Sequence, residues 1–199
     1  MIGLSPLYTN IWLEAENPEQ LKRPMKVFES TGASGGQYIM VPNQGKFGDG
    51  SAHFSFTVAQ SGNYYVMGRV KCPSDNDDSF FIEIDGRRKK WFADSTRGWK
   101  WRMVNDYDTN ENPAVFPLEK GDHTLIVECR EDGTAIDKIL ITDYKYANPK
   151  GYGGESINRS LEPDIIEEEN NKGGISELED KKPSAGPGAA GWSAPIYLD

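Results

Sequence analysis

The chain has 199 residues, with 22 Lys and Arg against 31 Asp and Glu, so its formal net charge is −9. This excess of negative charge argues against sequence-independent binding to nucleic acids and against binding to anionic membrane surfaces, because both are themselves negative. No run of about 18 apolar residues is present, so the sequence predicts no membrane-spanning helix.

Short runs of alternating apolar and polar residues follow one another through the first 146 residues, with turns between them. In residues 52–58, for example, Phe54 and Phe56 alternate with His53 and Ser55, which places the two phenylalanines on one face of a strand. The expected strands cover residues 10–16, 37–41, 52–58, 64–70, 79–84, 99–104, 114–118, 123–129 and 135–142, and a hairpin turn is expected at Asp85 and Gly86. Regular short strands without a long helix predict an all-β fold, either a β-sandwich or a jelly roll.

The distribution of charge and of glycine divides the chain into three expected parts. Residues 1–9 form an N-terminal arm, residues 10–146 form the sandwich, and residues 147–199 form an irregular acidic tail or linker. Residues 151–199 hold ten acidic and four basic residues, a charge of −6, together with eight Gly and four Pro. This composition is typical of an extended segment. Its apolar end, residues 191–199, is either a flexible terminus or a short peptide that docks on a partner.

Several phrases of the sequence, taken in order, are similar to those of one protein family. They are Trp-Leu-Glu-Ala-Glu at 12–16, Ala-Ser-Gly-Gly-Gln-Tyr at 33–38, Gly-Asn-Tyr-Tyr-Val-Met-Gly-Arg at 62–69, Asp-Ser-Phe-Phe-Ile-Glu-Ile-Asp at 78–85, Gly-Asp-His-Thr-Leu at 121–125 and Arg-Glu-Asp-Gly-Thr-Ala-Ile-Asp-Lys-Ile at 130–139. The set resembles the galactose-binding-like β-sandwich modules, especially carbohydrate-binding module families 6 and 35. The resemblance covers about residues 10–146 and implies a non-catalytic module of a secreted or cell-surface protein.

The resemblance also implies a structural calcium ion near the first strand. The carboxylates that hold it in the family match Glu14, Glu16 and Asp137, and the carbonyl-bearing loop matches the region of Ser34. The predicted cofactor is therefore Ca²⁺, with these four residues as its site.

The residues themselves leave a second interpretation open. Glu14 and Glu16 are two apart in an expected strand, so they point to the same face and repel each other unless a cation lies between them. Calcium takes six to eight oxygens and suits such a pair. Alternatively, the two glutamates lie at a solvated strand edge and pair with Lys22 or Arg23.

Tryptophans give the clearest signal of a ligand. The flat indole ring suits the apolar C–H face of a sugar, while polar neighbours bind the hydroxyls. Trp99 and Trp101 share one face with Met103, which favours Trp101 facing the core and Trp99 lying exposed beside a loop. In the family a binding cleft lies among the loops at one end of the sandwich. The residues here that match it are Tyr38, Asn76, Asp78, Trp99, Glu131 and Asp132.

One departure from the family concerns that cleft. Many family 6 members carry a sugar-binding Asn two residues before the Asp near the end of the domain, and this chain has Ala135 there. A methyl group cannot bond a hydroxyl, so the departure favours an altered or silent cleft.

Two other features leave alternatives open. The basic run at residues 87–90 is either a solvated strand edge or a contact for an acidic glycan or for the acidic tail. Cys72 and Cys129 both lie at strand ends, and they either form one disulfide or remain small buried thiols.

Catalysis has little support, because the sequence has no Gly-x-Ser-x-Gly elbow, phosphate-binding loop or His-Glu-x-x-His motif. We therefore expect a calcium-stabilised module that tethers a secreted or cell-surface protein to a polysaccharide, its signal peptide absent from this sequence. The alternative is a structural interaction domain of an extracellular assembly, with the C-terminal tail docking on a protein partner.

Overall fold

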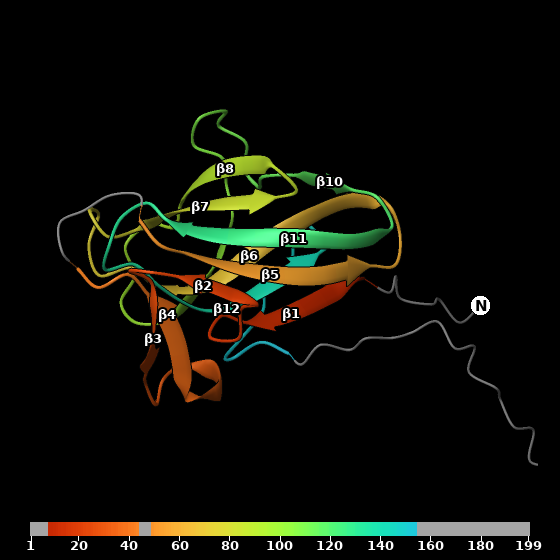
Figure 1. Cartoon of the computed structure of the whole chain (residues 1–199). Helices are drawn as coiled ribbons and strands as arrows, with labels where there is room; N and C mark the ends of the chain where they lie inside the picture. Colours follow the sequence, from red (N-terminus) through yellow and green to blue (C-terminus); the bar gives the residue numbers. More distant parts are fainter. Residues whose placement is uncertain (1–7, 44–48, 155–199) are drawn as a thin grey trace, which may run out of the picture. The chain divides into compact units, whose positions relative to one another are not determined.

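Two antiparallel sheets make up the computed structural model, which describes residues 8–43 and 49–154 (Figure 1). The five-stranded sheet has the order β2 (Gln20–Lys22), β5 (Ser51–Val58), β11 (Gly121–Cys129), β7 (Ser79–Ile84) and β8 (Arg87–Phe92). The seven-stranded sheet runs in the order β10 (Phe116–Leu118), β6 (Gly62–Lys71), β12 (Ala135–Thr142), β4 (Gln37–Met40) and β3 (Lys26–Glu29). In addition, β1 (Asn10–Glu14) pairs with β12, and β9 (Lys100–Met103) pairs with β6.

The predicted all-β sandwich is confirmed by this arrangement, and most strands lie where the sequence places them. Strand β12 has the expected bounds, and β7 and its Asp85–Gly86 turn are also as expected. The sequence analysis missed the short strands β2 and β3, and β1 ends two residues earlier than expected, at Glu14. Most of the expected tail, residues 155–199, lies outside the described residues, as do residues 1–7 of the expected arm.

The hydrophobic core lies between the sheets and follows the period of the strands. In β5, Phe54 and Phe56 are buried whereas Ser55 is exposed, as predicted. Apolar side chains from the paired strand β11, such as Leu125 and Val127, are fully buried beside them. Burial of alternate residues holds the two sheets together through the hydrophobic effect.

Trp91 is the largest side chain of this core and is fully buried. It reaches from β8 to the backbone of β6, where a Cβ added at Gly68 would lie 2.7 Å from the indole ring. Real Cβ atoms do not approach this closely, so Gly68 is needed for the fit of the tryptophan. Trp91 is therefore a core residue and presents no ring face to a ligand.

None of the described residues forms a helix with the length and hydropathy that crossing a membrane requires.

Candidate functional site

The four residues of the expected calcium site lie together, at the end of β1 and beside β12. A shift in the β12–β6 register between Ile136 and Lys138 places a bulge at Asp137. A bulge changes the direction in which the side chain of the extra residue points. Asp137 accepts a hydrogen bond from the backbone amide of Ser34 (2.7 Å), and the Ser34 hydroxyl donates to Glu14 Oε1 (3.1 Å).

Two basic residues that the sequence analysis did not single out belong to this cluster. Lys138 Nζ lies 2.6 Å from Glu14 Oε1 and 3.3 Å from the Ser34 hydroxyl, and Arg69 forms an ion pair with Asp137. Both basic side chains are buried. The base that pairs with Glu14 is therefore Lys138, and not Lys22 or Arg23. A signal was present, since a strand otherwise made of apolar residues rarely carries a charge without a partner.

Two carboxylate oxygens of the cluster, Glu14 Oε2 and Glu16 Oε2, are buried without a hydrogen-bond partner in the described part of the chain. Burial raises the pKa of Glu16 to about 7, and the nearby charges of Glu14 and Asp137 add to the rise. Burial also raises the pKa of Asp137, although Arg69 opposes this effect.

The unpartnered oxygens of Glu14 and Glu16 fit a bound cation. Calcium needs six to eight oxygens, so most of its ligands would be carbonyl groups and water. Among residues 8–43 and 49–154, no three His, Cys, Asp or Glu side chains converge as metal ligands.

The expected ligand-binding residues fall into groups, and the first is aromatic. Tyr38 of β4 and Trp99, just before β9, meet edge to face with their ring centroids 5.2 Å apart. Tyr38 also stacks on Phe28, its partner across the β3–β4 pair, at 5.6 Å. The guanidinium of Arg69 lies 5.5 Å from the Trp99 ring. Both Tyr38 and Trp99 are half-buried, so part of each ring faces solvent.

The second group is acidic and more buried than expected of an open cleft. The Asp78 amide donates to Glu131 Oε2 (3.3 Å), which also accepts from the Ser79 hydroxyl (2.5 Å). Asp78, Glu131 and Asp132 are only 6, 8 and 7% exposed, whereas Asn76 is exposed. The roles of these four residues in binding stay predictions.

Opposite shifts in pKa separate the two carboxyls of this group. Burial, followed by the charge of Glu131, raises the pKa of Asp78 to about 6. Burial acts in the same direction on Glu131, but hydrogen bonds from Ser79 and from the Asp78 amide, together with Arg130, hold its pKa below the usual value.

The expectation that Trp101 faces the core is wrong. Trp101 lies on the outer face of the seven-stranded sheet, where its ring contacts that of Trp12 at 5.5 Å and its indole nitrogen donates to the Gly151 carbonyl (3.1 Å). Trp99 and Trp101 share a face, as predicted, but that face is the outer one.

Ala135 is buried between Met40 and Lys71 of the neighbouring strands, and its side chain offers no polar group to a ligand.

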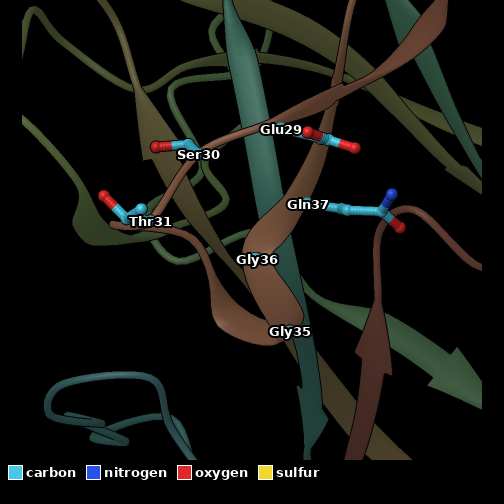
Figure 2. Close-up of a pocket in the computed structure, with 6 residues that line it drawn as sticks. All are labelled: Glu29, Ser30, Thr31, Gly35, Gly36 and Gln37. Carbon is cyan, nitrogen blue, oxygen red and sulfur yellow. The ribbon is translucent and has the colours of Figure 1, made fainter.

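A shallow hollow of about 340 Å³ lies at the turn between β3 and β4, beside η1 (Ser34–Gly36), the short 3-10 turn (Figure 2). Figure 2 shows Glu29 and Gln37 extending to the same side of this hairpin. Because neighbouring residues of a strand alternate in direction, they face away from Phe28 and Tyr38. None of the expected ligand-binding residues lines the hollow, whose walls are Glu29, Ser30, Thr31, Gly35, Gly36 and Gln37.

Each residue of the basic run in β8 has a partner. Arg88 forms two hydrogen bonds with Glu128 (2.7 and 2.8 Å), and Arg87 donates to the Pro117 carbonyl (2.8 Å). Lys89 pairs with Glu111 (2.7 Å) and Lys90 with Asp108 (2.5 Å). Three of the four basic side chains on this edge strand of the five-stranded sheet thus pair with the chain's own acidic residues.

Cys72 and Cys129 are both free thiols in the structure, and both are buried. Burial raises the pKa of each thiol to about 12.

Comparison with known proteins gives similarity of structure only. No protein-family model matches the sequence, and the search of curated proteins gives no significant match. A family 35 carbohydrate binding module from Clostridium thermocellum has a TM-score of 0.52 at 22% identity, covering 65% of this chain and 96% of that module. The GH26-CBM35 β-(1,4)-mannanase of Podospora anserina has a TM-score of 0.54 at 15% identity over 71% of this chain.

The match spans only 28% of the mannanase chain. The C-terminal CBM6 of LamC, from Zobellia galactanivorans, has a TM-score of 0.49 at 15% identity, with 67% of this chain and 99% of that module covered. The isolated family 35 module, matched over 96% of its length with a TM-score above 0.5, shows that this chain has the β-sandwich fold of such a module.

Proposed function

We propose that the sandwich is a non-catalytic carbohydrate-binding module in which Trp99 and Tyr38 contact the sugar. The observation that carries this proposal is the pair of half-buried aromatic rings, 5.2 Å apart, on a fold shared with family 35 modules. A sugar ring presents C–H groups that pack on the open part of such rings, and its hydroxyls bond to polar groups around them. The mannanase and the isolated module named above support a saccharide as the ligand class.

Glycan retention tests this proposal directly. The full chain is run in affinity gels that contain β-mannan or other plant, algal and bacterial polysaccharides, and the retained glycan is titrated. We expect Trp99→Ala to weaken binding about ten-fold or more, because it removes the stacking surface. Tyr107→Ala is the control, since Tyr107 is exposed but lies against Lys90 and Phe92 on another part of the domain. Equal losses in the two variants, or no retention on any glycan, would contradict the proposal.

We also propose that the cluster around Glu14 and Glu16 binds a structural calcium ion. The support is the pair of buried carboxylate oxygens without a partner in the described residues. When bound, calcium would supply positive charge between the carboxylates at the end of β1 and the turn at Ser34, and would so stabilise the contact between them. An ion that binds only the folded state stabilises it by about 2.7 kcal/mol at a hundred times its Kd.

Melting curves in calcium and in chelator test this second proposal. We expect a higher Tm with calcium, and we expect Glu16→Gln to remove the difference. Glu29→Gln is the control, because Glu29 is exposed on β3. Identical curves with and without calcium would mean that Lys138 and Arg69 alone compensate the charge of these carboxylates.

In the proposed context the module holds a secreted or cell-surface protein on its polysaccharide. The alternative, an interaction domain within an assembly, is favoured by the burial of Ala135 where the family places a sugar-binding Asn. Sizing and scattering of the full chain separate the two, because the alternative predicts a stable oligomer and no retention on glycans.

A further inference from the structure

Residues 151–154, with the sequence Gly-Tyr-Gly-Gly, lie on the outer face of the seven-stranded sheet. The carbonyl of Gly151 accepts hydrogen bonds from two side chains of that sheet, Arg69 Nε (3.0 Å) and Trp101 Nε1 (3.1 Å). The ring of Tyr152 lies 4.7 Å from the Arg69 guanidinium. We call these four residues the strap.

The two glycines that end the strap fit against the indoles of the sheet without room for a side chain. A Cβ at Gly153 would lie 2.5 Å from the Trp12 ring and 2.9 Å from the Trp101 ring, and the residue has a φ of +79°. A Cβ at Gly154 would lie 3.0 Å from the Trp12 indole nitrogen. The strap is therefore a fitted contact that depends on glycine at residue 153.

Arg69 links the strap to the aromatic pair of the proposed glycan site. Its guanidinium lies 4.7 Å from the centre of the Tyr152 ring and 5.5 Å from the centre of the Trp99 ring. Arg69 Nη1 also donates to the Gly32 carbonyl (3.1 Å) and pairs with Asp137. A guanidinium holds its donors in one rigid plane, so loss of the strap changes the position of the whole group.

The other side of this linkage is the contact between Trp99 and the β3–β4 turn. A Cβ at Gly32 would lie 3.3 Å from the Trp99 ring, so the indole packs closely on the backbone that Arg69 also binds. Trp99 in turn contacts Tyr38. A continuous set of contacts thus runs from the strap through Arg69 to both rings that we assign to sugar binding.

We infer that the strap positions the glycan site, with Arg69 as the positioning residue between them. This inference rests on the proposed function and extends it to the regulation of the same site. The chain continues from the strap into residues 155–199, so a partner bound to that segment would act on Trp99 only by displacing the strap. Displacement of the strap removes the Gly151 carbonyl and the Tyr152 ring from the buried guanidinium of Arg69. The contact between Arg69 and the Trp99 ring is then weakened.

The first test uses NMR spectra of the full chain and needs no glycan. We expect Gly153→Ala to shift the indole N–H signals of Trp12 and Trp101 and also that of Trp99. The matched control is Gly86→Ala, since Gly86 has a φ of +80° but its added Cβ meets no described atom within 4 Å. The inference is overturned if Trp12 and Trp101 respond while Trp99 does not, or if none of the three responds.

The second test measures glycan affinity in a double-mutant cycle. We expect Gly153→Ala and Arg69→Lys each to weaken binding about five- to ten-fold, as the loss of one net hydrogen bond does, and the double variant to be no weaker than the worse single one. Arg69→Lys keeps the positive charge beside Asp137 but not the planar group. Additive losses would overturn the linkage. Absence of glycan binding in the unaltered chain would instead refute the proposed function, and the NMR test would still decide the role of the strap.

Discussion

The inner and outer faces of the seven-stranded sheet are formed by the same strands but are stabilised differently. The inner face of β12 presents Ile136, Ile139 and Ile141, each at most 1% exposed and part of one apolar core. The outer face carries a row of facing residues from four strands: Glu14, Lys138, Arg69 and Trp101.

Side chains are buried for different reasons on the two faces of this sheet. On the inner face any apolar residue of suitable size and shape can stabilise the fold, because the driving force is the removal of apolar area from water. On the outer face each buried polar group needs a particular partner, such as Asp137 for Arg69 and Glu14 for Lys138. A substitution on the inner face therefore removes apolar contacts, whereas a substitution on the outer face also leaves a buried polar partner unpaired.

Two tryptophans, one on each side of the seven-stranded sheet, allow the two faces to be compared directly. We expect Trp91→Ala to lower the free energy of unfolding by about 3–5 kcal/mol, since it leaves a cavity in the core. Trp101→Ala should cost only about 1–2 kcal/mol, because it removes one hydrogen bond and partial packing at a half-buried site. Urea denaturation of both variants measures the difference. Similar costs for the two would mean that the outer face is as tightly packed as the core.

A second comparison contrasts a buried ion pair with a surface one. In the Arg69–Asp137 pair the side chains are 10 and 0% exposed, whereas in the Arg88–Glu128 pair they are 41 and 26% exposed. We expect Arg69→Ala to cost about 3–5 kcal/mol, because Asp137 is then left charged and buried.

Arg88→Ala is the matched control for that change, with an expected cost below about 1 kcal/mol, since water and salt screen the exposed pair. Asp137→Asn in the Arg69→Ala background should recover part of the loss by removing the unpaired charge. If the double variant is no more stable than Arg69→Ala, the buried charge is not the cause of the loss.

The sequence predicted the parts of the fold that local patterns determine. Alternation in β5 identified Phe54 and Phe56 as core residues, and the apolar run of β12 gave the bounds of that strand. The Asp-Gly pair at 85–86 gave the turn between β7 and β8, because such residues readily adopt the positive φ that a tight turn requires. These signals lie within a few residues of one another along the chain.

The sequence could not predict contacts that depend on distant segments. Strand alternation showed that Trp99 and Trp101 share a face, but it does not say which face meets the other sheet, so Trp101 was assigned to the core. The partners of Arg69 come from residues 32, 137 and 151, and nothing in the local sequence joins them. The bulge at Asp137 likewise depends on the pairing of β12 with β6.

The two histidines, His53 and His123, lie on neighbouring strands of the five-stranded sheet. His123 Nδ1 lies 2.5 Å from an Asp85 oxygen and Nε2 lies 2.7 Å from the Glu119 carbonyl oxygen. Both partners accept hydrogen bonds, so the ring donates from both nitrogens, as only the protonated form can. Burial acts to lower the pKa of His123, but the bonds to Asp85 and Glu119 raise it overall. Burial and then Lys22 lower the pKa of His53.

These opposite shifts predict opposite contributions to stability as the pH changes. The bonds of His123 stabilise the fold fully below pH 6.5, the unfolded value, and this contribution is lost as the pH rises through the higher folded pKa. His53 destabilises the fold as the pH falls below 6.5, because the unfolded chain binds that proton more readily. We expect His123→Gln to cost most stability below pH 6.5 and less above it, and His53→Gln to remove a loss seen only at low pH. NMR titration of the two rings provides the direct measurement, and a His123 midpoint at or below 6.5 would show that Asp85 and Glu119 do not hold the proton on His123.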